Sequence, residues 1–203
     1  MKNKARRILP ILLVVLFILL FFCLKDIYQS LKKDTTVKTL DSIENYNYTL
    51  NENDSEYFKK EFKNLKKILE SDSIVEEEYA SALSKLFTID FYSLNDAISK
   101  SDVGGIQFVY DEYRDSFLIK AKDTIYNYVE SNLYGKRTQE LPEVKEVEVT
   151  NIEKKEYDGE KEQDDEAYYV DVTITYEKDL DYPTECSFIW IHHNNKLELV
   201  EME

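Results

Sequence analysis

The residue types best suited to chemistry are scarce in this chain: it has two histidines, His192 and His193, and two cysteines, Cys23 and Cys186. Neighbouring residues of a strand point to opposite faces, so the two imidazoles cannot readily bind one metal ion. Cys186 lies six positions before His192, about 20 Å away on an extended strand, which is too far for a nucleophile and its base. The sequence therefore predicts no catalytic residue, no metal site and no cofactor, and it favours a protein that is not an enzyme.

An acidic residue beside aromatic ones is the best candidate for a ligand pocket. Asp90 interrupts the apolar face of a predicted helix, and a carboxylate against an apolar pocket can act as a base with a raised pKa. The alternative is an ordinary aspartate that is exposed or accepts a backbone N–H. The candidate lining residues are Asp90, Phe91, Tyr168, Tyr176 and Trp190. The other interpretation is that these aromatic side chains simply fill the core, because each buries a large area.

Lysines gather on one face of the first predicted helix, and they form the basic patch of the body of the chain. Lys59, Lys63 and Lys66 are therefore candidates for contact with anionic lipid or with a cell-wall polymer. The alternative is a solvated helix face, which commonly carries such charges.

Net charge argues against nucleic acid as a partner. The chain holds 26 basic and 41 acidic residues, which gives a net charge of −15. Such a surface repels a phosphate backbone. Two segments resemble ligand loops but lack the spacing: Val103-Gly104-Gly105 has no phosphate-loop lysine, and the acidic run at 160–166 lacks the ligand pattern of a calcium loop.

The N-terminus carries an apolar run that is typical of a membrane span. Residues 8–24 read ILPILLVVLFILLFFCL, without a charge, and at about 1.5 Å per residue they reach about 26 Å. The end of the run lacks the small residues of a signal-peptide cleavage site, and Phe22 before Cys23 is unlike a lipoprotein site. We therefore expect an uncleaved signal anchor, with cleavage and lipidation as the alternatives.

Charge and pattern then divide the chain into four parts. The basic residues of 1–7 place this segment in the cytoplasm as a short tail, by the positive-inside rule. Residues 8–24 are the predicted transmembrane helix of a single-pass protein of the cell membrane. Residues 25–55 form a stalk with a first strand near 46–50, and residues 56–203 form an extracytoplasmic domain.

Hydrophobic periodicity predicts helices first and strands afterwards in this domain. Apolar residues at helical spacing predict helices over about 56–70, 74–92 and 112–132. Ser73 and Glu76 resemble a capping box at the start of the second helix. After Pro142 the apolar residues alternate, most strictly over 168–176, which predicts at least four antiparallel strands. The expected fold is α+β: an N-terminal transmembrane helix, then two to three helices packed on a curved antiparallel sheet of four or more strands.

The order of these elements carries a family resemblance. Over about Glu56–Glu203, the sequence of helices followed by a curved sheet resembles the cone-shaped nuclear-transport-factor-2-like superfamily. A cystatin-like domain is the nearest structural alternative. An anchor with such a domain also resembles the inner-membrane assembly factors of type IV secretion, and this implies a scaffold role. The stretches LFTIDFYSLNDAISKSDVGG and RDSFLIKAKDTIY are similar to uncharacterised single-pass membrane proteins of low-GC Gram-positive bacteria.

Two functions remain open at this point. The first is a membrane-anchored interaction or scaffold domain that acts through contact with other membrane or envelope proteins, for example in secretion or envelope assembly. The tether raises its effective concentration for such partners. The second is a small-ligand-binding or enzymatic pocket domain on the same anchor.

Overall fold

A computed structural model describes residues 38–203, so the predicted tail, the predicted transmembrane helix and residues 25–37 of the predicted stalk lie outside the described residues. The chain divides into two compact units. In the smaller one, the described residues are Lys38, Thr39 and Asn51–Asn53, and Glu52 N–H donates to Lys38 C=O at 2.9 Å. The larger unit comprises Leu40–Leu50 and Asp54–Glu203, and it contains the helices and the four-stranded sheet.

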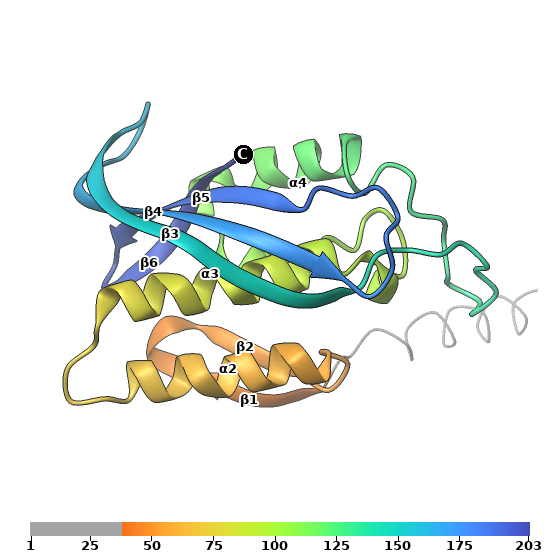
Figure 1. Cartoon of the computed structure of the whole chain (residues 1–203), viewed down its shortest axis with the longest axis horizontal. Coiled ribbons are helices and arrows are strands. Elements are labelled where there is room, and N and C mark those ends of the chain that lie inside the picture. Colours follow the sequence, from red (N-terminus) through yellow and green to blue (C-terminus); the bar gives the residue numbers. More distant parts are fainter. Residues whose placement is uncertain (1–37) are drawn as a thin grey trace, which may run out of the picture. The chain divides into compact units, whose positions relative to one another are not determined.

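The larger unit is an α+β structure with three helices on a four-stranded antiparallel sheet, which confirms this part of the prediction (Figure 1). The helices are α2 (Glu56–Leu69), α3 (Glu76–Tyr92) and α4 (Arg114–Asp123). The strands of the sheet, in spatial order, are β3 (Val144–Asp158), β4 (Gln163–Tyr176), β5 (Glu185–His193) and β6 (Lys196–Met202). The predicted strand near 46–50 does not join this sheet. It is β2 (Tyr48–Asn51), which pairs with β1 (Thr39–Ile43).

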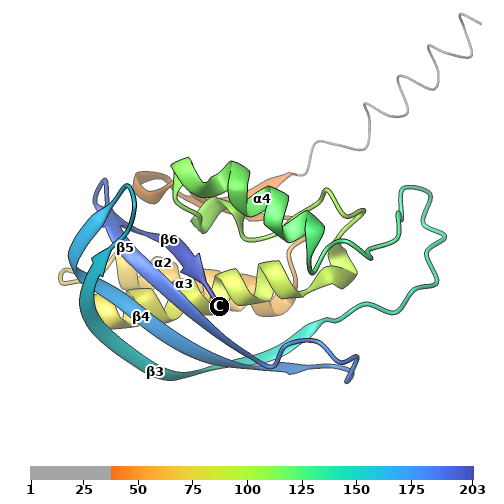
Figure 2. The same ribbon diagram turned by 90° about the horizontal axis from the view of Figure 1, so that it is seen from above.

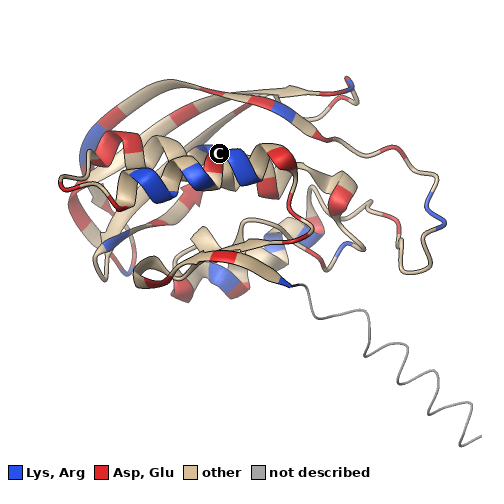
Figure 3. Cartoon of the chain, turned by 90° about the horizontal axis from the view of Figure 1, so that it is seen from below, with Lys and Arg blue, Asp and Glu red and all other residues tan. Residues whose placement is uncertain are grey.

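Helix α2 begins and ends close to the predicted positions. The Ser55 hydroxyl accepts a hydrogen bond from the Phe58 N–H at 3.1 Å and so caps the first turn. The apolar stripe is buried, as the spacing of its residues predicts; its members are Phe58, Phe62, Leu65 and Leu69. The lysines lie on the opposite face, which Figure 3 shows as a row of basic residues along the helix.

Helix α3 is the centre of the core. Side chains on almost every side of it are buried, because it packs against α2, β3 and β4. A helix surrounded in this way must satisfy its own polar groups. The Ser84 hydroxyl donates to Ala80 C=O at 2.9 Å, and the Thr88 hydroxyl donates to Ser84 C=O at 2.7 Å. Trp190 of β5 donates its indole N–H to the Ser84 hydroxyl at 2.8 Å and ties the sheet to the helix.

The third predicted helix, over 112–132, is wrong in its extent. It is a short 3-10 turn, η4 (Asp111–Tyr113), followed by α4, which ends at Asp123. The next residue, Thr124, has φ −117° and ψ −106°, which breaks the helical path. The reason is tertiary: the chain turns so that Tyr126, which is almost fully buried, donates its hydroxyl to Phe91 C=O at 2.7 Å. A loop therefore replaces the second half of the predicted helix.

The sheet follows the predicted alternation and curves around α3 (Figure 2). Along β4, Tyr168, Val170, Val172 and Ile174 are buried in the core that the sheet shares with the helices. Register shifts interrupt the β3–β4 pairing at three places, between Val144 and Glu146, Val149 and Asn151, and Lys155 and Tyr157. Such bulges bend and twist a strand, which lets this sheet wrap a helix instead of remaining flat.

Two further expectations concern cysteine and membrane helices. Cys186 is buried, and its burial raises the pKa of the thiol to about 11, so this group behaves as a small core residue. Among the helices formed by residues 38–203, none has the length and hydrophobicity that a membrane crossing requires.

Candidate functional site

An open pocket of about 860 Å³ lies at the end of the sheet where α3 begins and where β5 turns into β6. In Figure 1 this is the left end of the domain. The tight turn that closes it holds Asn194 and Asn195 in the left-handed region, with φ of 49° and 64°. Charged and aromatic groups dominate the wall, which is formed by Tyr46, Ile74, Val75, Glu76, Glu77, Tyr79, Lys154, Tyr168, His192, His193, Asn194, Asn195, Lys196 and Leu197.

Glu76, the first residue of α3, is the hub of the polar groups in this pocket. One of its carboxylate oxygens accepts the Tyr168 hydroxyl at 2.9 Å and lies 3.5 Å from the Lys154 ammonium. The other lies 3.3 Å from Nε2 of His192. The carboxylate also sits at the helix N-terminus, where the helix dipole favours negative charge.

His192 is held between two carboxylates. Its Nδ1 lies 2.8 Å from an oxygen of Asp164, which also accepts the backbone N–H of His192 at 2.6 Å. Its Nε2 faces Glu76 on the other side. Only an imidazolium donates to both carboxylates at once, whereas a neutral ring donates to one of them. The ring therefore links β4 to the start of α3 through charge-assisted contacts.

Both carboxylates keep a pKa below their ordinary values. Burial acts to raise the pKa of Glu76, but the hydrogen bond from Tyr168 and the neighbouring His192 and Lys154 outweigh it. For Asp164, burial again acts to raise the pKa, and the hydrogen bonds from His192 and Glu166 outweigh it. Both groups are consequently ionised at neutral pH.

The floor of the pocket is a closed set of hydrogen bonds. The Leu197 N–H donates to the Tyr79 hydroxyl at 3.3 Å, and the Tyr48 hydroxyl donates to Leu197 C=O at 3.2 Å. The two hydroxyls are 2.8 Å apart, and Tyr79 donates there, because Tyr48 already uses its proton. Burial raises the pKa of both tyrosines, so they stay neutral and supply fixed dipoles and aromatic surface.

The wall of the pocket holds two carboxylates, Glu76 and Glu77, and two ammonium groups, Lys154 and Lys196, and further carboxylates lie behind it. The cationic side chains Lys154 and Lys196 are already paired: Lys154 with Glu76 and Glu166, and Lys196 with the buried Glu198 at 2.6 Å. The carboxylate of Asp164 lies behind His192. An approaching ligand therefore meets the exposed Glu77 carboxylate, while Glu76 and the two ammonium groups already have partners within the domain.

The wall of the pocket is made mainly of carboxylate, imidazole, ammonium and tyrosine groups. None of the side chains that line the pocket in the described chain is Ser, Thr or Cys, which a nucleophilic triad requires. The carboxylates contact different nitrogens of His192, and within residues 38–203 no group of three or more His, Cys, Asp or Glu is arranged to hold a metal ion. What remains is a rigid pocket of carboxylates and tyrosine faces.

The five predicted pocket residues are not brought together by the structure. Tyr168 lines the pocket. Trp190 and Phe91 are buried in the core, and Tyr176 is partly exposed and packs against Tyr182. Asp90 lies in the last turns of α3, where its carboxylate accepts the Gly105 N–H at 2.7 Å.

The environment of Asp90 nevertheless changes the pKa of its carboxyl group. Burial, assisted by the charges of Asp54, Asp102 and Asp96, raises the pKa of Asp90 to about 6 from 3.8, although the Gly105 hydrogen bond acts in the opposite direction. A carboxyl group whose pKa is raised by folding destabilises the fold when it ionises. The contribution of Asp90 to stability therefore falls as the pH rises from about 4 through about 6.

Asp90→Asn is expected to remove this loss and to leave the variant about 1–2 kcal/mol more stable than the wild type at neutral pH. The gain is smaller than the full pKa shift implies, because Asp90 is partly accessible to solvent. Near pH 4 the two proteins should be equally stable. Urea unfolding at both pH values measures the difference. Asp123→Asn, which removes an exposed carboxylate of α4, is the control and should show no such change between the two pH values. A difference for Asp90→Asn that does not depend on pH would contradict the raised pKa.

The candidate envelope contacts on α2 are partly neutralised. Lys59 pairs with Glu56 at 2.8 Å, and Lys66 pairs with Asp41 at 2.7 Å. Lys63 is exposed. Paired lysines present less net charge to an anionic polymer, so this face offers a weaker contact than the sequence alone indicates.

Apart from Tyr168, sequence reasoning missed the residues that form the pocket. Glu76 resembled part of a capping box with Ser73, but the residue before the helix is Val75 and its side chain makes no cap. Glu76 is thus the first helical residue, which cannot reach back to Ser73, and its carboxylate turns to Tyr168 and His192 instead. A usable signal was the alternation of β5, which places His192 on the same face as Trp190.

Comparison with known proteins adds no assignment. The chain matches no protein-family model, and searches of curated proteins and of solved structures likewise gave no match.

Proposed function

We propose that this chain is a membrane-anchored, extracytoplasmic interaction domain that acts through protein–protein contact and recognises a basic segment of its partner in the acidic pocket. The observation that carries this proposal is the open pocket of about 860 Å³, whose wall holds Glu76 and the exposed Glu77 beside the rings of Tyr46 and Tyr168. The apolar run at 8–24 and the basic residues before it support the anchor and the orientation.

The chemistry of the pocket favours arginine or lysine side chains. Glu77 is exposed in its wall, Glu76 is held ionised there, and the ionised Asp164 lies behind His192. A guanidinium can bind a carboxylate through two hydrogen bonds and can stack on an aromatic ring. Tyr46 and Tyr168 offer such rings in the wall. The net charge of −15 also attracts a basic partner over longer distances and speeds its association.

The anchor gives this binding its physical advantage. A domain confined to a membrane surface meets membrane-bound partners at a high effective concentration, so a weak individual contact is sufficient. Other membrane or envelope proteins, such as components of secretion or envelope assembly, are the partners that this arrangement suits. The resemblance to the nuclear-transport-factor-2-like superfamily stays a prediction.

A small cationic molecule is the second candidate for the pocket. Its volume lies within the range of about 300–1,000 Å³ that small-ligand sites occupy. A polyamine offers the same ammonium chemistry as a lysine-rich segment. It differs in being short, so it engages the pocket without contacting the surface around it.

The decisive measurement is binding of an arginine-rich peptide to the full chain in nanodiscs, followed by fluorescence anisotropy. The double variant Glu76→Gln and Glu77→Gln is expected to weaken binding about 10- to 100-fold, because two hydrogen bonds to charged groups are lost. Glu130→Gln combined with Asp123→Asn removes the same charge from exposed positions on another part of the surface and should change affinity little.

Two outcomes count against the proposal. If both double variants weaken binding equally, the peptide senses only the overall charge and the pocket is not its site. If spermidine competes fully at the same concentration as the peptide, the small-molecule alternative is favoured, because the peptide then gains nothing from its length.

A further inference from the structure

The loop between α4 and β3, residues 124–143, displays large apolar side chains to solvent. Tyr134 is 83% exposed and Tyr128 is 78% exposed, and Leu133 is 53% exposed. Ile98, in the adjacent segment, is 50% exposed. Single exposed apolar residues are common, but a group of them on one loop marks a contact surface. We call Ile98, Tyr128, Leu133 and Tyr134 the aromatic loop surface.

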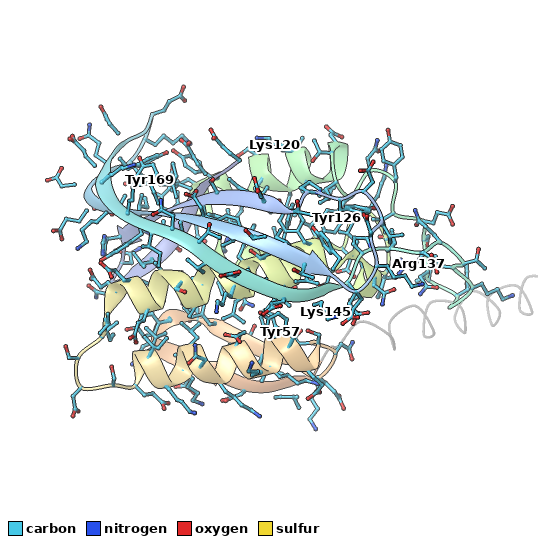
Figure 4. All side chains as sticks on the ribbon, viewed as in Figure 1. Tyr57, Lys120, Tyr126, Arg137, Lys145 and Tyr169 are labelled. Atoms are coloured by element: carbon cyan, nitrogen blue, oxygen red, sulfur yellow. The ribbon has the colours of Figure 1, made fainter. Side chains whose placement is uncertain are left out.

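This display is fixed by hydrogen bonds within the domain. The Arg137 guanidinium donates to Ala97 C=O and to Asn95 C=O, each at 2.6 Å, and Figure 4 shows Arg137 at this end of the domain. The Asn132 N–H donates to Ile98 C=O at 2.7 Å, and Gln139 bridges the backbone of Tyr128 and Glu130. The root of the loop is the buried Tyr126. These hydrogen bonds therefore fix the backbone from which the exposed side chains of the aromatic loop surface project.

The tip of the loop differs from the rest of the chain in charge. Residues 131–139 contain the basic residues Lys136 and Arg137 and no acidic one, in a chain of net charge −15. The acidic residues of the loop, Glu130, Glu140 and Glu143, lie on either side of this tip. Tyrosine together with lysine is the combination that lies at the boundary between lipid and water. An anionic headgroup layer would attract the two cations at this tip.

The position of the loop suits a flat surface. Figures 1 and 2 show it projecting beyond the ends of the strands, at the end of the domain opposite the start of α3. A protruding loop can touch a plane without a clash between the rest of the domain and that plane. The 17 residues of α3 separate it from the pocket, which is about 25 Å of helix.

The length of chain before the domain brings lipid within reach. Only residues 25–39 separate the apolar run from the larger unit, and extended chain spans at most about 3.6 Å per residue, or roughly 50 Å in total. We propose that the aromatic loop surface docks on the surface of the lipid bilayer. This inference rests on the proposed membrane anchor. This contact holds the acidic pocket on the side of the domain that faces away from the membrane.

Quenching by brominated lipids tests the docking directly. The full chain is placed in nanodiscs made of anionic and zwitterionic lipid, with bromine near the headgroup end of the acyl chains. In a Trp190→Phe background, which removes the native indole, Tyr134→Trp puts an indole on the loop. Val75→Trp, at an exposed residue of the pocket wall, is the matched control. The indole introduced at the loop is expected to lose most of its emission on brominated lipid, while the control keeps its emission.

The outcomes separate the anchor from the docking. A chain that elutes with the nanodiscs but shows equal quenching at both positions, or none at the loop, overturns the docking and leaves the anchor intact. A chain that does not elute with the nanodiscs refutes the anchor and the docking that depends on it. Tyr134→Trp combined with Leu133→Asp should lose the quenching, and retained quenching would contradict a role for the apolar side chains.

Discussion

Trp190→Ala is expected to lower the free energy of unfolding by about 3–5 kcal/mol, the range for the removal of a large aromatic side chain from a core. Trp190 is 0% exposed, and its ring lies against those of Phe87 and Phe188, with centroids 6.4 Å and 6.3 Å away. The substitution leaves a cavity in the layer between the sheet and α3. Because small domains are stable by only about 5–15 kcal/mol, this loss is a large part of the total.

Urea unfolding followed by far-ultraviolet circular dichroism measures this effect, since the substitution removes the only tryptophan of the chain. Trp190→Phe is the matched control. It keeps most of the ring volume and loses the indole N–H, while the Ser84 hydroxyl keeps its bond to Ala80 C=O. The control should cost clearly less than the alanine variant. Equal losses would show that the hydrogen bond to Ser84, and not the packing, carries the contribution of Trp190.

Local patterns were sufficient for most of the elements. The serine at position 55 and the four apolar residues after it predict α2 from local sequence alone. The alternation from Tyr168 to Ile174 likewise specifies β4, because its period of two determines which side chains face the core. Both features depend on residues that are close in sequence, which is why the layered α+β fold could be predicted.

The end of α4 shows where this reasoning fails. Phe117, Ala121, Ile125 and Tyr128 have helical spacing, yet Tyr128 is exposed and the helix has already ended. The competing interaction is the bond from Tyr126 to Phe91 C=O, a carbonyl 35 residues earlier in the chain. A long-range contact of this kind outweighs the small differences in helix propensity among ordinary residues.

The pocket could not be predicted for the same reason. Glu76 and His192 are 116 residues apart in sequence, and Asp164 approaches His192 from a different strand. No spacing rule connects them, because they meet only when the curved sheet wraps around the start of α3. The sequence did indicate that aromatic residues and carboxylates matter, but it placed them around Asp90, at the opposite end of the same helix.

Helix α3 thus connects the two proposed contact regions. Its first residue, Glu76, organises the acidic pocket, and at its other end the backbone of Phe91 accepts the hydroxyl of Tyr126, at the root of the loop. A rigid, buried helix between the two fixes their separation. If the loop rests on lipid, the helix sets how far from the membrane a partner is bound, and this distance restricts which parts of a membrane-bound partner can reach the pocket.

Lys196→Met is expected to cost about 3–5 kcal/mol of stability, because it leaves a buried carboxylate without its ammonium partner. Glu198 is 2% exposed, and it contacts the Lys196 ammonium at 2.6 Å and Nδ1 of His193 at 2.6 Å. The Tyr110 ring packs edge-on against His193, with centroids 4.8 Å apart, and helps to exclude water from this cluster. Thermal and urea unfolding of the variant measure the loss.

The double variant Lys196→Met and Glu198→Leu separates two contributions to the free energy of unfolding: the penalty of a buried carboxylate without its ammonium, and the stabilisation by the ion pair itself. If the loss in the single variant is the penalty of a buried carboxylate that has lost its ammonium partner and keeps only His193, removal of that carboxylate should restore most of the stability, since an apolar pair of similar volume is often as stable as a buried ion pair. A double variant as unstable as the single one would instead show that Lys196 stabilises the fold through its own packing, where its ammonium lies 6.0 Å from the centre of the Tyr48 ring. Lys196 also lines the pocket. If the double variant regains stability but does not regain peptide binding, the ion pair shapes the binding site and is not required for the stability of the fold.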